Sequence, residues 1–230
     1  MQEYQKVNEG EYLFPARLRM AFLLVKSGKL DEARELLQQT AVKNKQEQAQ
    51  LILTEAQILR DAKKYDQAYK VLCKGLELLP EQPDLLYEAA LVADKQGKPE
   101  VFEKNLRMLM KVEPDHAHAY NALGYSLLER KERLPEAMQL VEKAYQLAPD
   151  DAAILDSMGW GYYRLGNFPK SLDFMRRAYS AFPDPEVAAH LGEVLWQTNA
   201  KDEAKKIWQE SLKEHPESAA LQTVIKRFMP

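Results

Sequence analysis

Four histidines are the side chains in this chain best suited to metal or acid–base chemistry: His116, His118, His190 and His215. The pair His116 and His118 could touch a metal ion, but no third ligand follows at metal-binding spacing. Glu193 lies one helical turn after His190, yet the zinc motif HExxH is absent. We therefore predict no metal centre and expect His190 to be a packed or surface residue.

Two further patterns resemble sites of chemistry. Gly159-Trp160-Gly161 is not a phosphate loop, because no strand precedes it and no Lys-Ser or Lys-Thr follows. The pair Asp150-Asp151 precedes a helical pattern, where acids cap helices, and acids recur at comparable boundaries at Asp84, Asp115 and Asp184. We predict no catalytic residue and no cofactor, hence no enzyme. The alternative is an enzyme whose site follows no known pattern or lies outside this chain.

Five prolines set the organisation of the chain, because they recur at intervals of 33 to 35 residues: Pro80, Pro114, Pro149, Pro183 and Pro216. Such a period resembles that of tetratricopeptide repeats, each of which is a helix–turn–helix. No segment alternates with a period of two for long enough to indicate a sheet. The expected fold is an all-α, right-handed tetratricopeptide superhelix (an α-solenoid) of about six repeats with a C-terminal capping helix.

The repeat frame divides the chain into a polar N-terminal segment, six repeats and a cap: 1–13, then 14–48, 49–82, 83–116, 117–151, 152–184 and 185–216, then 217–230. Gly28, Gly97 and Gly166 fall between the two predicted helices of a repeat, where a left-handed residue ends the first helix. The fourth repeat has one extra residue, which we place in the turn 130–133. Gly159 lies where two helices approach closely, so Gly159→Val should cost about 1–3 kcal/mol.

In tetratricopeptide repeats the first helix of each pair lines a concave face, so its outward positions predict a partner groove. The candidate residues are Tyr87, Leu91, His118, Asn121, Tyr125, Asp156, Trp160, Tyr163, Arg164, Glu193 and Trp196. Four aromatic residues among them recur near one face of successive repeats: Tyr87, Tyr125, Trp160 and Trp196. We expect these rings to be partly exposed and to receive a helix or extended segment of a partner. The alternative is that at least two of them are mostly buried core residues.

One familiar groove chemistry is missing from these positions. Repeats that hold acidic chaperone tails use lysines, arginines and asparagines, whereas the corresponding residues here are Asn121, Tyr125, Asp156, Trp160, Ala189 and Glu193. The groove is therefore expected to be aromatic and mildly acidic. A partner with apolar and basic character fits it better than an acidic tail.

Bulk composition agrees with a folded protein and excludes some partners. Hydrophobic residues make up 46% and charged residues 29% of the chain, and the net charge is −3. This charge gives no field for nucleic acid or lipid. The longest apolar run, 20–25, is too short to span a bilayer. The single cysteine, Cys73, is expected to be a small packed residue. The first repeat lacks a polar cap, so its apolar residues Leu18, Phe22 and Val25 could pair with a second copy.

The C-terminal half carries more than the generic repeat pattern. The strings 119–125 (AYNALGY), 156–160 (DSMGW) and 184–196 (DPEVAAHLGEVLW) resemble a proteobacterial tetratricopeptide family of outer-membrane lipoproteins that partner a C-terminal processing protease. This resemblance implies a periplasmic, outer-membrane-associated adaptor that binds the protease and delivers cell-wall hydrolases to it. Membrane attachment would come only from an N-terminal lipid anchor that this chain lacks. The alternative is an assembly scaffold for secretion, a pilus or another complex, which could be cytoplasmic.

Overall fold

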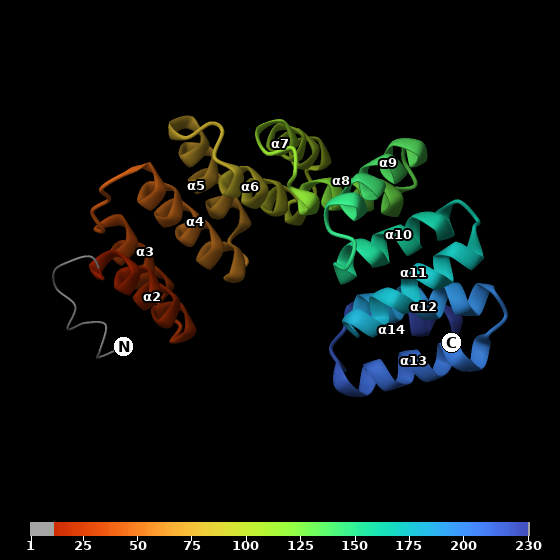
Figure 1. Cartoon of the computed structure of the whole chain (residues 1–230). Helices are drawn as coiled ribbons and strands as arrows, with labels where there is room; N and C mark the ends of the chain where they lie inside the picture. Colours follow the sequence, from red (N-terminus) through yellow and green to blue (C-terminus); the bar gives the residue numbers. More distant parts are fainter. Residues whose placement is uncertain (1–11, 230) are drawn as a thin grey trace. The chain divides into compact units, whose positions relative to one another are not determined.

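The computed structural model describes residues 12–229, and over these residues it contains thirteen α-helices and no strand (Figure 1). Consecutive helices pack against each other as pairs joined by short turns, which confirms the predicted all-α fold of helix pairs. The chain divides into two compact units, which we call the N-terminal unit (residues 1–114) and the C-terminal unit (residues 115–230). The predicted polar segment 1–13 lies outside the described residues except for Tyr12 and Leu13.

The N-terminal unit contains three helix pairs: α2 (Leu13–Lys26) with α3 (Leu30–Gln38), α4 (Lys45–Asp61) with α5 (Tyr65–Leu78), and α6 (Pro83–Lys95) with α7 (Pro99–Val112). Its core is built from small and branched apolar residues on the facing sides of these helices. Ala33, Leu37 and Ile58 belong to one buried cluster, while Ala68 and Leu72 belong to the next. The predicted free residues Leu18, Phe22 and Val25 are half-buried against the first of these clusters.

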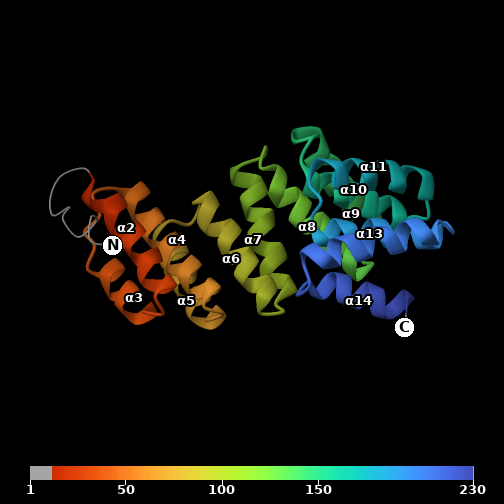
Figure 2. The same cartoon turned by 90° about the horizontal axis from the view of Figure 1, so that it is seen from below.

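The C-terminal unit contains three more pairs and a single last helix: α8 (Ala117–Arg130) with α9 (Leu134–Leu147), α10 (Ala152–Arg164) with α11 (Phe168–Ala181), α12 (Pro185–Gln197) with α13 (Lys201–Glu214), and then α14 (Ala219–Phe228). Helix α14 packs on α12 and α13 (Figure 2). It buries Leu221 and Val224, and the ring of Phe228 stacks on Trp208 with 5.7 Å between ring centres. Leu221, Val224 and Phe228 thus form an apolar stripe along α14, and this side of the helix covers the last helix pair.

The turns inside the six helix pairs share one backbone feature, a residue with positive φ. Gly28, Gly97 and Gly166 have φ of 76°, 66° and 76°, as predicted, and the other three turns use Lys63, Lys131 and Asn199. A side chain in this left-handed region costs about 1–2 kcal/mol, so glycine is the relaxed choice there. Helix α9 begins three residues after Lys131, whereas α11 begins two residues after Gly166. The extra residue of the fourth repeat therefore lies in this turn, as predicted.

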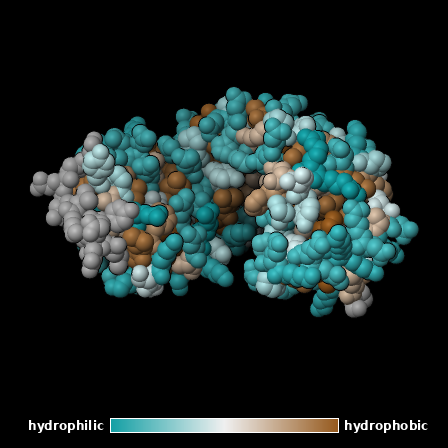
Figure 3. Space-filling view, turned by 60° about the horizontal axis from the view of Figure 1, so that its bottom comes forward, coloured by the Kyte–Doolittle hydropathy of each residue, from teal (hydrophilic) through white to brown (hydrophobic). Residues whose placement is uncertain are grey.

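Close helix packing explains why Gly159 must stay small. A Cβ atom added there would lie 2.7 Å from Cγ of Met175 on the paired helix α11. This contact is shorter than side chains tolerate, which supports the expected cost of Gly159→Val. Hydrophilic residues cover most of the face in Figure 3, with hydrophobic residues in small patches, because the apolar sides of the helices face one another.

Candidate functional site

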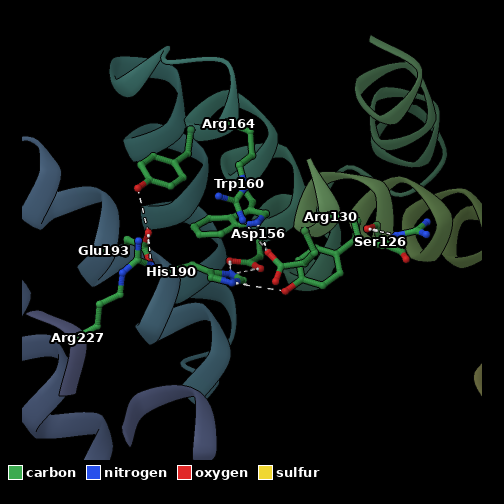
Figure 4. Close-up of polar contacts among 11 residues, drawn as sticks. Ser126, Arg130, Asp156, Trp160, Arg164, His190, Glu193 and Arg227 are labelled. Carbon is green, nitrogen blue, oxygen red and sulfur yellow. Dashed lines mark hydrogen bonds and ion pairs between the residues drawn. The ribbon is translucent and has the colours of Figure 1, made fainter. Parts of the chain in front are cut away.

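The first helices of the C-terminal unit carry a connected set of aromatic and charged side chains, which we call the α8–α14 network because α8, α10, α12 and α14 contribute to it (Figure 4). Trp160 of α10 lies at its centre. The Trp160 ring stacks on the imidazole of His190 from α12, with 4.1 Å between ring centres. The guanidinium of Arg164, one helical turn further along α10, lies 4.4 Å from the centre of the same indole. Only 4% of the Trp160 surface is exposed.

His190 and Asp156 form the most enclosed polar pair of this network. His190 Nδ1 lies 2.9 Å from Asp156 Oδ2, and His190 Nε2 lies 3.5 Å from the hydroxyl of Tyr125 on α8. Burial lowers the pKa of His190, but the charge and hydrogen bond of Asp156 and the charges of Glu129 and Glu186 together raise it more, so this pKa lies above the ordinary 6.5. The imidazole of His190 thereby compensates the negative charge of Asp156, whose side chain is almost fully buried.

An aspartate, a histidine and a hydroxyl in a row resemble a proton relay, so the acidity of each group matters. Burial, followed by the charges of Glu129 and Asp156, raises the pKa of Tyr125 far above its ordinary value. A nucleophile needs the opposite shift, and a general base needs a histidine that is readily neutral. The arrangement therefore favours a structural link between α8, α10 and α12 over catalysis.

Two glutamates connect the remaining members of the network. Glu129 of α8 accepts hydrogen bonds from Trp160 Nε1 and, at 3.3 Å, from Arg164 Nη2. Glu193 of α12 accepts a hydrogen bond of 2.9 Å from the Tyr163 hydroxyl and pairs with Arg227 of α14 at 3.4 Å. Burial first, and then Glu193, raises the pKa of Tyr163 to about 12. Each first helix is thus bound to the next one by charged or aromatic contacts.

Two cavities open beside this network. The larger, of about 380 Å³, is lined by residues of α8, α10, α12 and α14: Glu129, Trp160, Arg164, Ala189, His190, Glu193, Ala219, Ala220, Thr223, Val224 and Arg227. The smaller, of about 280 Å³, has acids and no cation in its lining: Asn121, Tyr125, Ala152, Ala153, Asp156, Ser157, Phe182, Asp184, Glu186 and Val187. Phe182 in this second cavity is 61% exposed. We call them the large and the small cavity.

The structure brings many of the predicted groove residues together but changes the exposure of some. Asn121, Tyr125 and Asp156 line the small cavity, and Trp160, Arg164 and Glu193 line the large one. The expectation that Trp160 is partly exposed is wrong, because the His190 ring and the Arg164 guanidinium lie against its indole. Asp156 and Glu193 are buried as well, each beside its partner group. Whether these residues bind a partner stays a prediction.

The other predicted groove residues lie apart from the network. Trp196 is half-buried, stacks on Trp208 and contacts the tilted ring of Phe228, so it packs against α13 and α14 instead of lining either cavity. His118 is exposed, 3.8 Å from Asp151. Tyr87 and Leu91 are half-buried and belong to the N-terminal unit. Of the four rings expected to be partly exposed, Tyr87, Tyr125 and Trp196 are half-buried and Trp160 is buried, but only Tyr125 and Trp160 belong to the network.

Sequence reasoning missed Glu129 and Arg227 and gave His190 no partner. The spacing of these three residues from their partners was a signal that the sequence contained. Glu129 is 31 residues before Trp160, and both His190 and Arg227 are 34 residues after the acid that they pair with. A search for complementary side chains about one repeat apart would have found all three.

The remaining chemistry read from the sequence has local explanations. Asp151 and Asp184 cap α10 and α12 as predicted, but α8 is capped by His116, whose Nδ1 accepts from Ala119 N, and not by Asp115. Asp84 lies in the first turn of α6 and is not its cap. Over residues 12–229, no group of three His, Cys, Asp or Glu is placed to hold a metal ion. Within the same range, none of the helices is both long and apolar enough to cross a bilayer.

A succession of helix pairs with left-handed turns and side chains coupled one repeat apart defines a helical repeat protein. The family model described as tetratricopeptide repeat matches residues 87–152 and 157–219, and the chain belongs to this family. Members of the family are typically non-catalytic and act as protein-interaction scaffolds, and a tetratricopeptide repeat domain implies protein binding.

Among relatives, TPR repeat-containing protein PA4667 of Pseudomonas aeruginosa is 42% identical over 193 residues, which cover 84% of this chain and 33% of that protein. The chain thus spans about a third of this relative. The structure of TTC0263, a thermophilic TPR protein of Thermus thermophilus, has a TM-score of 0.68 at 22% identity and covers 79% of this chain and 98% of that one. PilF of P. aeruginosa gives 0.64 at 18% identity, covering 82% and 95%. These two likenesses concern the fold alone.

Proposed function

We propose that this chain is an adaptor that binds a C-terminal processing protease in the bacterial periplasm and helps to present cell-wall hydrolases to it. The observation that carries the proposal is the α8–α14 network with its two cavities. Except for its α14 residues, the network lies in the stretch where the sequence resembles protease-partnering lipoproteins, from Ala119 to Trp196. Association with the outer membrane is part of the same proposal.

The residues that line the two cavities indicate which side chains a partner segment would carry. Asp184 and Glu186 stand in the small cavity with the exposed ring of Phe182, and no lysine or arginine lines it. A basic side chain with an apolar stem would pair with the carboxylates and cover the ring. The large cavity offers the exposed edge of α14, where Ala219 and Thr223 leave room for an apolar side chain. The partner segment is therefore basic and apolar.

The binding test uses a purified C-terminal processing protease and measures its affinity for the intact chain by biolayer interferometry. The variant Thr223→Arg places a long, charged side chain in the large cavity, where the apolar side chain of the partner segment would bind. We expect it to weaken binding by about tenfold or more. The matched control is Gln222→Arg, because Gln222 is the exposed neighbour on α14 that does not line the cavity. This control should bind like the unaltered chain.

The possible outcomes separate the partner from the site. If the protease does not bind the unaltered chain, the protease adaptor is wrong and the interaction scaffold remains. If the protease binds both variants equally well, the large cavity is not the site.

A second candidate, a scaffold for pilus or secretion assembly, rests on the likeness to PilF at 18% identity. Because that likeness concerns only the fold, it gives the weaker support. Capture of pilus or secretion components in place of a protease would favour it.

A further inference from the structure

A second groove lies in the N-terminal unit, between the second helices α5 and α7, and takes no part in the proposed function. Its volume is about 570 Å³. The first helix α6 contributes only the buried side chains Leu86 and Ala89, which close its floor. The groove therefore lies on the second helices of two consecutive pairs, whereas the α8–α14 network lies on first helices.

The α5 wall of this groove is apolar. Tyr69 and Leu76 line it two helical turns apart, Pro80 follows just after the end of α5, and none of the three is fully buried. Met108 of α7 adds a flexible side chain that is 37% exposed. Exposed methionine beside half-buried apolar side chains is typical of surfaces that adapt to an incoming apolar segment.

The α7 wall is basic. Lys104, Arg107 and Lys111 line the groove and lie on one face of α7 over two turns, about 10 Å along the helix axis. Arg107 pairs with Glu103 at 2.7 Å, but neither Lys104 nor Lys111 forms an ion pair with any carboxylate in the described part of the chain. Both lysines are exposed, so their charges are available to a partner.

One acidic residue of the groove would determine the orientation of a bound partner segment. Glu77 lies on the α5 side and is the single carboxylate that lines the groove. It repels negative charge from the apolar wall, while Lys104 and Lys111 attract negative charge to the opposite wall. A partner segment with acidic residues along one edge and apolar residues along the other is complementary to both walls.

We propose that the α5–α7 groove binds an acidic amphipathic helix of a partner protein. Its carboxylates, recurring at helical spacing, would face Lys104 and Lys111, and its apolar side would lie on Leu76, Pro80 and Met108. This partner differs in charge from the basic segment expected at the small cavity. The chain would thus hold two proteins through two chemically distinct surfaces, and the second surface does not depend on the identity of the first partner.

A peptide selection tests this proposal without a known partner. A library of random peptides displayed on phage is selected on the intact chain and counter-selected on the double variant Lys104→Glu, Lys111→Glu. We expect the enriched peptides to carry Asp or Glu and apolar residues at helical spacing. Synthetic versions should bind the double variant about tenfold more weakly or worse, and should lose affinity as salt is added.

The matched control carries the same two charge reversals on α5, Lys70→Glu and Lys74→Glu, because both residues are exposed and neither lines the groove. It should bind the selected peptides like the unaltered chain. Selection of no peptide, or of neutral or basic peptides, would overturn the proposal. Vesicles of phosphatidylglycerol are tested in parallel, and their retention by the unaltered chain in place of acidic peptides would assign the groove to a membrane surface and overturn it equally. Thr223 is unaltered in these variants, so protease binding is judged separately.

Discussion

The two units use the same repeat but bind their successive first helices together differently. In the N-terminal unit, α4 and α6 are joined by an ion pair of 2.9 Å between Arg60 and Glu88, above a core of apolar side chains. In the C-terminal unit, the corresponding helices are joined by stacked rings and several charged contacts around Trp160 and His190. The repeat frame therefore specifies the backbone and leaves the coupling between neighbours open.

The energetic balance of the two couplings also differs. Burial raises the pKa of Glu88, and Arg60 offsets this only in part, while one carboxylate oxygen of Glu88 has no hydrogen-bond partner in the described residues. In the C-terminal unit, Asp156, Glu129 and Glu186 together more than offset the effect of burial on the pKa of His190. A buried charge thus weakens one interface, whereas a compensated pair stabilises the other.

The largest expected difference between the units comes from Trp160→Ala. This substitution empties the centre of the α8–α14 network and should destabilise the C-terminal unit by about 3–5 kcal/mol. Tyr87→Ala, on the first helix α6 of the N-terminal unit, should cost less because Tyr87 is only half-buried. Hydrogen exchange of α10 and α12 compared with α4 and α6 measures the two units separately.

An equal loss of hydrogen-exchange protection in the Trp160→Ala and Tyr87→Ala variants would contradict the expected difference between the two units. If the Trp160 ring were exposed in a partner groove, as expected from the sequence, Trp160→Ala would weaken partner binding and leave melting nearly intact. Burial of the ring makes Trp160 a residue that the fold requires, so the binding test moves to Thr223.

The next effect in size is on pH dependence. The pKa of His190 is raised in the folded state, so the stabilisation by its pair is fully present below about pH 6.5 and is lost as the pH rises through the folded pKa. His190→Gln should therefore cost more at about pH 6 than at about pH 8. Burial also raises the pKa of Glu88 above its ordinary 4.5, so the charge of Glu88 opposes folding at neutral pH. Glu88→Gln should therefore leave the free energy of unfolding unchanged at this pH or increase it.

Urea unfolding of both variants at the two pH values, followed by hydrogen exchange in each unit, measures these effects. A cost of His190→Gln that does not change with pH would show that the imidazole only fills space. A large cost of Glu88→Gln at neutral pH would show that the Arg60 pair stabilises the N-terminal unit after all.

The smallest effect concerns the turns, where the units are expected to behave alike. Lys63→Gly and Lys131→Gly relax a left-handed backbone in the N-terminal and C-terminal units, respectively. Each should stabilise its unit by about 1 kcal/mol, less the entropy that glycine adds to the unfolded chain. Gly166→Ala is the reverse control and should destabilise. A gain in only one unit, by thermal unfolding, would indicate that the turn also carries contacts specific to that unit.

Much of the fold could be predicted because it depends on local rules repeated along the chain. Prolines at a fixed period, glycines that end the first helices and the stripe from Leu221 to Phe228 each report on a few neighbouring residues. The turn with the extra residue was found for the same reason. The left-handed Lys63, Lys131 and Asn199 were missed because lysine and asparagine do not mark such a backbone as glycine does.

The site was predicted only in part, because exposure depends on contacts one repeat away. The positions of Tyr125, Asp156 and Trp160 on the first helices followed from the frame. The burial of Trp160 did not, since it arises from His190 on the next first helix together with the nearby Arg164. Trp196 was wrongly assigned to the groove for a related reason, because its ring packs against Trp208 and Phe228, which lie on two other helices.

The single thiol of this chain lies in the α5–α7 groove, where Cys73 is half-buried among the lining side chains. Because the sequence contains no other cysteine, a maleimide dye would attach at this one position without any mutagenesis. The emission of the dye would then follow occupation of the groove in real time, and a bulky dye would itself block the groove. The chain therefore carries a built-in attachment point for both a sensor and an inhibitor of its second surface.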